Sequence, residues 1–270
     1  MEIVYCCAWW GLDHLGMEGM VSKIKSGGFD GIEVGIPFND KEQTQLRKLL
    51  DKFDLQVIAH QYQAEGTTFS DFVKSFKYSL EQAARFQPLL INSHTGKDFW
   101  SIEENGVLIE IAQEISDKYG ITVAHETHRG RFLFSTFAAK QYFEKFPNLK
   151  INFDISHWCC VSESLLEDQP QIVEEAIKRT EHIHARVGHA QGAQITDPRL
   201  PEWETEVNTF INWWNRIVQR FRAEGRDFIT ITPEFGPTPY MWKIPFTQQP
   251  ISNHWDINCY MKDLLKERIL

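Results

Sequence analysis

The sequence predicts an α/β fold, a single (β/α)8 barrel domain that spans residues 1–270. Three observations support this prediction. The chain has 270 residues, close to the usual length of such a barrel, about 250 residues. Short apolar runs recur at intervals of about thirty residues, the length of one strand–helix–strand unit. Segments with helical periodicity lie between the runs, and this regular alternation favours a closed barrel over an open, doubly wound sheet.

Eight apolar runs are the predicted strands. They are Ile3–Ala8, Gly31–Gly35, Leu55–His60, Leu89–His94, Ile121–Glu126, Leu149–Asp154, His182–Arg186 and Phe228–Glu234. Most of them are apolar at nearly every position rather than at every second position. That pattern is typical of strands in a parallel sheet whose faces are both buried. We therefore expect a parallel sheet covered by the intervening helices.

The segments between the runs have the pattern of amphipathic helices. In residues 203–221, apolar side chains recur at spacings of three and four, as on one face of a helix. Ser101 and Glu104 have the spacing of a capping box, which predicts the start of another helix. Gly120 and the pair Gly27 and Gly28 stand where helices are expected to end. We expect the apolar faces of these helices to pack against the barrel.

Composition and charge narrow the classes of function. The formal net charge is −9, and because an acidic surface repels phosphate backbones, nucleic acid is not an expected partner. No apolar run reaches the roughly 18 residues of a membrane span. The first residues also lack the pattern of a signal peptide, so no membrane association is expected. Five cysteines without a CxxC pair are typical of reduced thiols, which predicts a cytoplasmic protein.

Ionisable side chains end most of the predicted strands. Catalytic groups of (β/α)8 barrels project from the C-terminal ends of the strands. At these C-terminal ends, the last four predicted strands carry Glu126, Asp154, His184 and Glu234. Three carboxylates at one barrel mouth would repel one another unless a cation lay between them. The sequence therefore predicts one bound divalent metal, and the mostly oxygen ligand set favours Mn²⁺, Co²⁺, Mg²⁺ or Fe²⁺, with Zn²⁺ as an alternative.

The order of these residues resembles a known group of barrels. Glu126, Asp154-x-x-His157, His184 and Glu234 follow one another as in the xylose isomerase-like TIM-barrel superfamily. This group includes sugar phosphate isomerases and epimerases, D-tagatose 3-epimerase and hydroxypyruvate isomerase. The resemblance extends from the first strand to the eighth. It implies an isomerase of carbohydrate metabolism, acting on a sugar or sugar phosphate, in which Glu126 and Glu234 are catalytic and transfer a proton through a metal-stabilised enediolate.

Further residues are predicted to contact a small carbohydrate substrate. By resemblance, His157 would bind a substrate oxygen. Epimerases of this group have an arginine six residues after the metal histidine, where this chain has Ala190, so the distal part of the substrate is expected to be bound differently. The remaining predicted contacts are Arg186, His94, His60, Trp9, Lys97 and Arg131. The basic residues would suit a phosphate or carboxylate, and an indole face packs well on the C–H groups of a sugar.

Two other residues at strand ends are interpreted from their position alone. Glu33 ends the second predicted strand, where it could bind a substrate hydroxyl or pair with a neighbouring cation. His125 precedes Glu126, and successive side chains of a strand point to opposite faces. We therefore expect His125 to face the helices and to have a structural role.

Alternative functions stay open. An inosose dehydratase would use the same metal and base to expel water, so these residues do not separate it from an isomerase. An endonuclease IV-like phosphodiesterase binds several zinc ions through extra histidines, and His60 and His94 stand in comparable places. However, residues 188–198 lack the Asp-x-His pair that such a site needs, and the negative charge opposes DNA binding. A barrel that only binds sugars would not need two acid/base glutamates. By resemblance, we also expect a homodimer.

Overall fold

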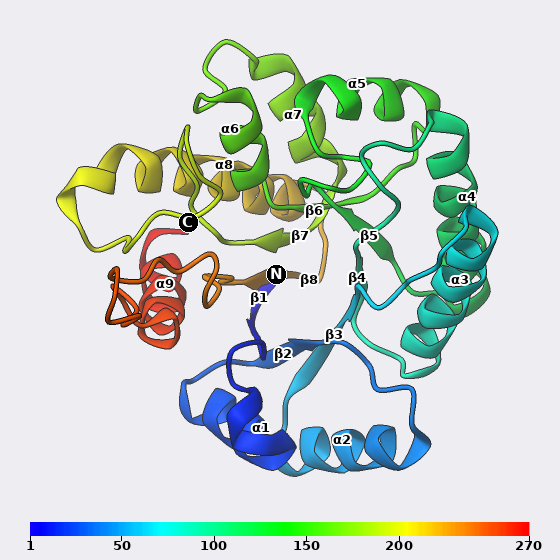
Figure 1. Cartoon of the computed structure of the whole chain (residues 1–270), viewed down its shortest axis with the longest axis horizontal. Helices are drawn as coiled ribbons and strands as arrows, with labels where there is room; N and C mark the ends of the chain where they lie inside the picture. Colours follow the sequence, from blue (N-terminus) through cyan, green and yellow to red (C-terminus); the bar gives the residue numbers. More distant parts are fainter. Residues whose placement is uncertain (270) are drawn as a thin grey trace.

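The structure is a computed structural model in which residues 1–269 are described. It contains a closed barrel of parallel strands in the order β1 to β8, and β1 closes the barrel by pairing with β8. Figure 1 shows the strands at the centre with helices around them. The strands are β1 (Glu2–Ala8), β2 (Gly31–Val34), β3 (Gln56–Gln61), β4 (Ile91–Ser93), β5 (Val123–Glu126), β6 (Ile151–Phe153), β7 (Thr180–His184) and β8 (Phe228–Thr232).

Helices connect the strands and cover the sheet. They are α1 (Gly16–Ser26), α2 (Asp40–Phe53), α3 (Phe69–Arg85), α4 (Ile102–Tyr119), α5 (Thr136–Lys145), α6 (Ser156–Ser162), α7 (Pro170–Arg179), α8 (Glu204–Ala223) and α9 (His254–Arg268). Two short 3-10 helices, Asp13–Leu15 and Pro201–Trp203, precede α1 and α8. Among the described residues, no helix is long and apolar enough to cross a membrane.

The predicted fold class and all eight predicted strands are confirmed, with ends that differ by two residues or fewer. The capping box is confirmed at the start of α4, where Ser101 and Glu104 bond to each other's backbone N–H. Gly120 ends α4 in the left-handed conformation, with φ of 66°, which favours glycine. The seventh strand differs most, because it ends at His184 and leaves Arg186 in the following loop.

The inside of the barrel is apolar at one end and polar at the other. A small interior cluster consists of Val4, Cys6, Ile58, Leu90 and Ala124, whereas the large core lies between the sheet and the helices. Toward the C-terminal ends of the strands, the buried side chains are polar, among them Glu33, Asn92 and His182. Because a buried polar group is costly unless it is bonded, this layer must supply its own partners.

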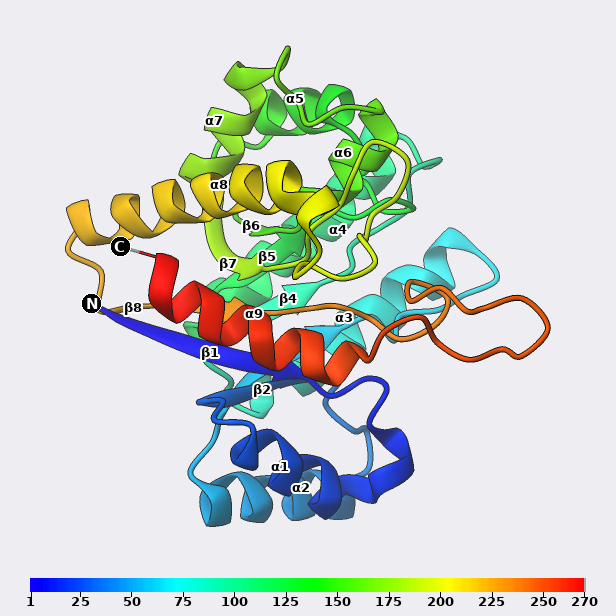
Figure 2. The same cartoon turned by 90° about the vertical axis from the view of Figure 1, so that its left-hand side faces the viewer.

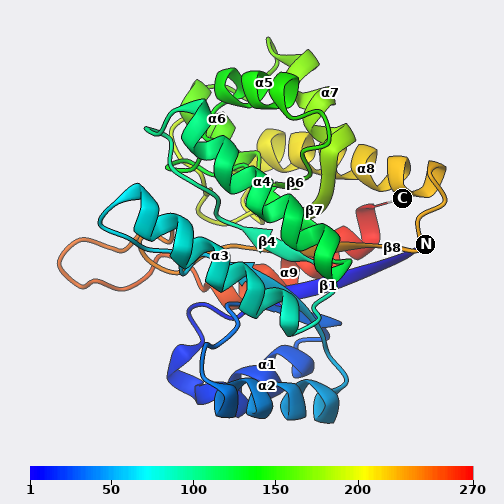
Figure 3. The same cartoon turned by 90° about the vertical axis from the view of Figure 1, so that its right-hand side faces the viewer.

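Long loops gather at the C-terminal end of the barrel. In Figures 2 and 3 both chain termini lie at the opposite end, and the loop between β8 and α9 projects from the C-terminal end. The loop contains five prolines, Pro233, Pro237, Pro239, Pro245 and Pro250. Its Tyr240 lines the pocket described below.

Candidate active site

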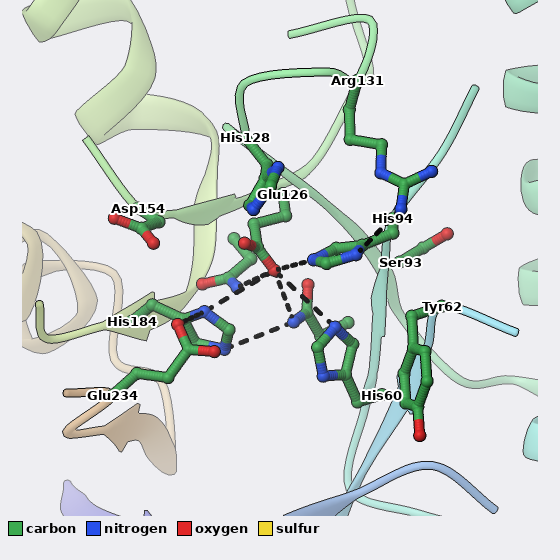
Figure 4. Close-up of polar contacts among 12 residues, drawn as sticks. His60, Tyr62, Ser93, His94, Glu126, His128, Arg131, Asp154, His184 and Glu234 are labelled. Atoms are coloured by element: carbon green, nitrogen blue, oxygen red, sulfur yellow. Dashed lines mark hydrogen bonds and ion pairs between the residues drawn. The ribbon is translucent and has the colours of Figure 1, made fainter. Parts of the chain in front are cut away.

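The four predicted metal ligands converge at the C-terminal ends of β5 to β8. They are Glu126, Asp154, His184 and Glu234, all of them buried, with ligand atoms within 4.8 Å of one another. Figure 4 shows these side chains pointing toward a common centre. Among the described residues, Asp154 Oδ2, His184 Nδ1 and Glu234 Oε2 lack a well-aligned hydrogen-bond partner. Because such atoms are costly to bury, the donor set fits a divalent cation with oxygen and imidazole ligands.

The His184 ring is oriented by a carboxylate on its far side. Glu33 Oε1 lies 2.8 Å from His184 Nε2, and this leaves Nδ1 directed at Glu234 Oε2, 2.6 Å away. The same Glu33 bonds to His182 Nε2 at 3.1 Å, deeper in the barrel. A carboxylate behind a histidine commonly fixes the ring of a metal ligand. Of the two interpretations of Glu33, the structure therefore supports pairing with neighbouring imidazoles.

Glu126 is held from the side of β4. Asn92 Nδ2 donates to Glu126 Oε2 at 2.9 Å, and His94 Nε2 lies 3.1 Å from the same oxygen. Asn92 also donates to Glu33 Oε1 at 2.9 Å. The side-chain amide of Asn92 thus hydrogen-bonds to both Glu126 and Glu33.

The most notable departure from the sequence-based expectation concerns Arg186. It is only 2% exposed, and its Nη1 and Nη2 lie 3.1 Å from Asp154 Oδ2 and 2.7 Å from Glu234 Oε2. Its Nε donates to the carbonyl oxygen of Glu234 at 2.8 Å. The guanidinium of Arg186 therefore pairs with the carboxylates of two candidate ligands, Asp154 and Glu234. This role comes in addition to any contact with substrate. Spacing along the chain did not predict these pairs, because they join the loop after β7 to residues that follow β6 and β8.

Charge is crowded at this centre, and the pKa values reflect it. Burial raises the pKa of Asp154 to about 7, and Glu234 and Glu126 add to this effect against the opposing charge of Arg186. Burial lowers the pKa of His184, but the surrounding carboxylates, Glu234 first, outweigh burial and raise that pKa well above its ordinary value. A cation bound between these groups would take the place of protons.

A pocket of about 300 Å³ opens above the ligands, at the lower end of the range for small-molecule sites. Seven predicted site residues line it: Trp9, His60, His94, Glu126, Arg131, Arg186 and Glu234. Glu33 and Trp10 line it as well, together with three polar or aromatic residues that the sequence did not indicate, Tyr62, His128 and Tyr240. The loop that carries Tyr240 has no periodic pattern, so no local signal could have identified it. Asn92, by contrast, occupies an inward position of β4, which strand alternation could have indicated.

His157 and Lys97 do not line this pocket. His157 is fully buried, with its ring centroid 4.0 Å from that of His128 and its Nε2 3.2 Å from Arg186 Nη1. Lys97 Nζ lies 5.8 Å from the ring centroid of Phe72, outside the pocket wall. For both residues, contact with substrate stays a prediction that this geometry does not support.

His125 lies outside the pocket lining, in agreement with its expected structural role. Its Nδ1 is 2.7 Å from Thr95 Oγ1, and its ring packs edge-on against Phe132 at 5.5 Å. The side chains of β5 thus alternate as expected, with Glu126 inside and His125 outside.

The family of the chain follows from a match to a family model. Residues 21–201 match the model described as xylose isomerase-like TIM barrel. The chain belongs to this family. The match covers β2 to β7, and with them three of the four candidate ligands. No curated protein sequence matches the chain.

Solved structures of the xylose isomerase-like fold are similar over nearly the whole chain. A D-tagatose 3-epimerase-like protein has 16% identity and a TM-score of 0.64, with 98% of this chain and 96% of that chain covered. A probable 3-DHS dehydratase from Bacillus anthracis has 16% identity and a TM-score of 0.59, with coverages of 98% and 99%. Endonuclease IV from Thermus thermophilus has 14% identity and a TM-score of 0.58, with coverages of 99% and 100%. These likenesses show the shared fold, and the reaction must be argued from the site.

Proposed function

We propose that this xylose isomerase-like protein is a divalent-metal-dependent isomerase or epimerase of a sugar or sugar phosphate. The observation that carries the proposal is the buried set of Glu126, Asp154, His184 and Glu234 within 4.8 Å. Two of its members, Glu126 and Glu234, also line the pocket. A group that both lines a pocket and belongs to a charged cluster is placed to exchange protons with a bound molecule.

The proposed reaction removes a proton from the carbon next to a carbonyl group and returns it either to the same carbon or to the former carbonyl carbon. A bound divalent cation would supply polarisation of the substrate carbonyl. One of the two glutamates removes the proton from the adjacent carbon. The C–H electron pair then forms a C=C bond, and the carbonyl π pair moves to oxygen, which gives an enediolate. Return of a proton to the same carbon from the other face, with the electron pair moving back to re-form the C=O bond, inverts that carbon. Return of a proton to the former carbonyl carbon, with transfer of the hydroxyl proton from the adjacent oxygen to the former carbonyl oxygen, moves the C=O bond and isomerises the sugar.

The walls of the pocket support a small carbohydrate as substrate. Trp9, Trp10, Tyr62 and Tyr240 line it, and aromatic faces pack on the C–H groups of sugars. Arg131 also lines it and would suit an anionic substituent. We further propose that the protein acts in the cytoplasm, has neither nucleic acid nor a membrane as partner, and forms a homodimer.

Hydrogen exchange into substrate tests this proposal. Metal-loaded protein is incubated with a panel of ketoses and ketose phosphates in D₂O, and the products are analysed by NMR. We expect deuterium at the carbon next to the carbonyl of one substrate class, and no exchange after chelation of the metal. Loss of water from the substrate would instead identify a dehydratase, which could use the same site. Absence of both reactions across the panel would argue against the proposal.

A further inference from the structure

A second cluster of potential ligands lies next to the first. His60, His94 and Glu126 have ligand atoms within 4.8 Å of one another, and Figure 4 shows the two imidazoles on the side of Glu126 that faces away from Asp154. His60 Nε2 lies 3.9 Å from Glu126 Oε2 and has no hydrogen-bond partner among the described residues. Two imidazoles and a carboxylate are sufficient to hold a zinc ion. The protein could therefore hold two metals that share Glu126.

The contact between Arg131 and His94 argues against a second metal. Arg131 Nη2 lies 3.3 Å from His94 Nδ1. Because a guanidinium has only donors, His94 Nδ1 must be the acceptor and its proton must reside on Nε2. That nitrogen lies 3.1 Å from Glu126 Oε2 and donates to it. To bind a cation through Nε2, His94 would have to carry its proton on Nδ1, and the Arg131 donor that faces Nδ1 opposes that tautomer. His94 is therefore placed to position Glu126.

We propose that Arg131 limits this site to one metal. It holds His94 in the tautomer that donates to Glu126, and its fixed charge next to the second cluster opposes the entry of another cation. Arg131 is thus a positioning residue that acts through His94. This inference rests on the proposed function, because it assumes that Glu126, Asp154, His184 and Glu234 bind the first metal.

Metal stoichiometry tests the inference directly. Chelator-stripped protein is dialysed against Zn²⁺ at a free concentration that saturates the first site, and zinc per chain is measured by elemental analysis. We expect one zinc in the wild type, two in Arg131→Met, and one again in the double variant Arg131→Met with His60→Ala. The matched control is Arg129→Met. Arg129 is in the same loop, but its guanidinium lies over the ring of Tyr240, 5.3 Å from the centroid, and one zinc is expected.

A measurement on the wild type tests the inference even if Arg131→Met does not fold. In ¹⁵N-histidine NMR of the metal-free protein, His94 is assigned by the loss of its signals in His94→Gln. We expect the Nε2–H tautomer of His94; the Nδ1–H tautomer would overturn the inference.

Two zinc ions in the wild type, or one in folded Arg131→Met, would also overturn the inference. If no variant bound zinc, the proposed function would fail together with the inference, whereas one zinc in every variant would leave the proposed function intact.

Discussion

The layer of candidate ligands beneath the pocket has two unlike walls. On the side of β6 to β8, Asp154 and Glu234 are crowded around His184, and a buried arginine, Arg186, offsets their charge. On the side of β3 and β4, side-chain nitrogen atoms of Asn92, His60 and His94 face Glu126. The first wall needs positive charge to be stable. In the second wall, Asn92 and His94 hydrogen-bond to Glu126, so the two clusters of ligand atoms have different roles.

Glu126 belongs to both walls, and its substitution has the largest expected effect. Glu126→Gln removes a metal ligand and one of the two acid/base groups while it keeps the side-chain shape. We expect the rate of hydrogen exchange into substrate to fall by about 10²–10⁴-fold, with fewer metal ions per chain by elemental analysis. An unchanged thermal midpoint would show that the fold is retained. Full activity would remove Glu126 from the mechanism.

Arg186→Met tests the charged wall. It leaves two buried carboxylates without their cation, and the free energy of unfolding of the metal-free protein is expected to fall by about 3–5 kcal/mol. Bound metal should offset part of this loss, so denaturant unfolding is measured with and without Mn²⁺.

The matched control is Arg199→Met. Arg199 pairs with Asp197, but its side chain is 45% exposed, and we expect a loss of about 1 kcal/mol or less. Equal losses for the two variants would show that the Arg186 pairs are not important for stability.

His60→Ala tests the wall on the side of β3 and β4. Because His60 Nε2 lies 3.9 Å from Glu126 Oε2 and makes no hydrogen bond, we expect metal content to stay at one ion per chain. Only a pocket-lining contact is lost, so kcat/KM is expected to fall by about tenfold or less, about 1.4 kcal/mol. Asp154→Asn is the comparison, since it should lose metal under the same dialysis. Loss of metal from His60→Ala would place both walls in one metal cluster and favour a multi-zinc enzyme.

Lys97→Met has the smallest expected effect. Lys97 lies outside the pocket wall, and a separated, partly exposed charge is largely screened by salt. We expect KM for an anionic sugar to rise by about threefold or less, and KM for a neutral sugar to be unchanged. A tenfold rise with the anionic sugar alone would restore Lys97 as a substrate contact.

Much of this architecture follows from local sequence. Strands buried on both faces need continuous apolar runs, so the eight strands could be located within two residues. The carboxyl ends of all strands in a closed parallel barrel meet at one mouth. For that reason, the ionisable residues at the ends of the last four predicted strands could be assigned to one site before any contact was known.

The partners of these groups depend on the tertiary structure. Glu33 and His184 are 151 residues apart in the chain, and Arg186 and Glu234 are separated by 48, yet each pair is in direct contact. Likewise, no local pattern indicates that Arg131 contacts the Nδ1 atom of His94. Periodicity determines only the face on which a side chain lies. Hydrogen bonds and buried ion pairs form only over about 3 Å with the correct orientation, and only closure of the barrel brings these atoms within that distance.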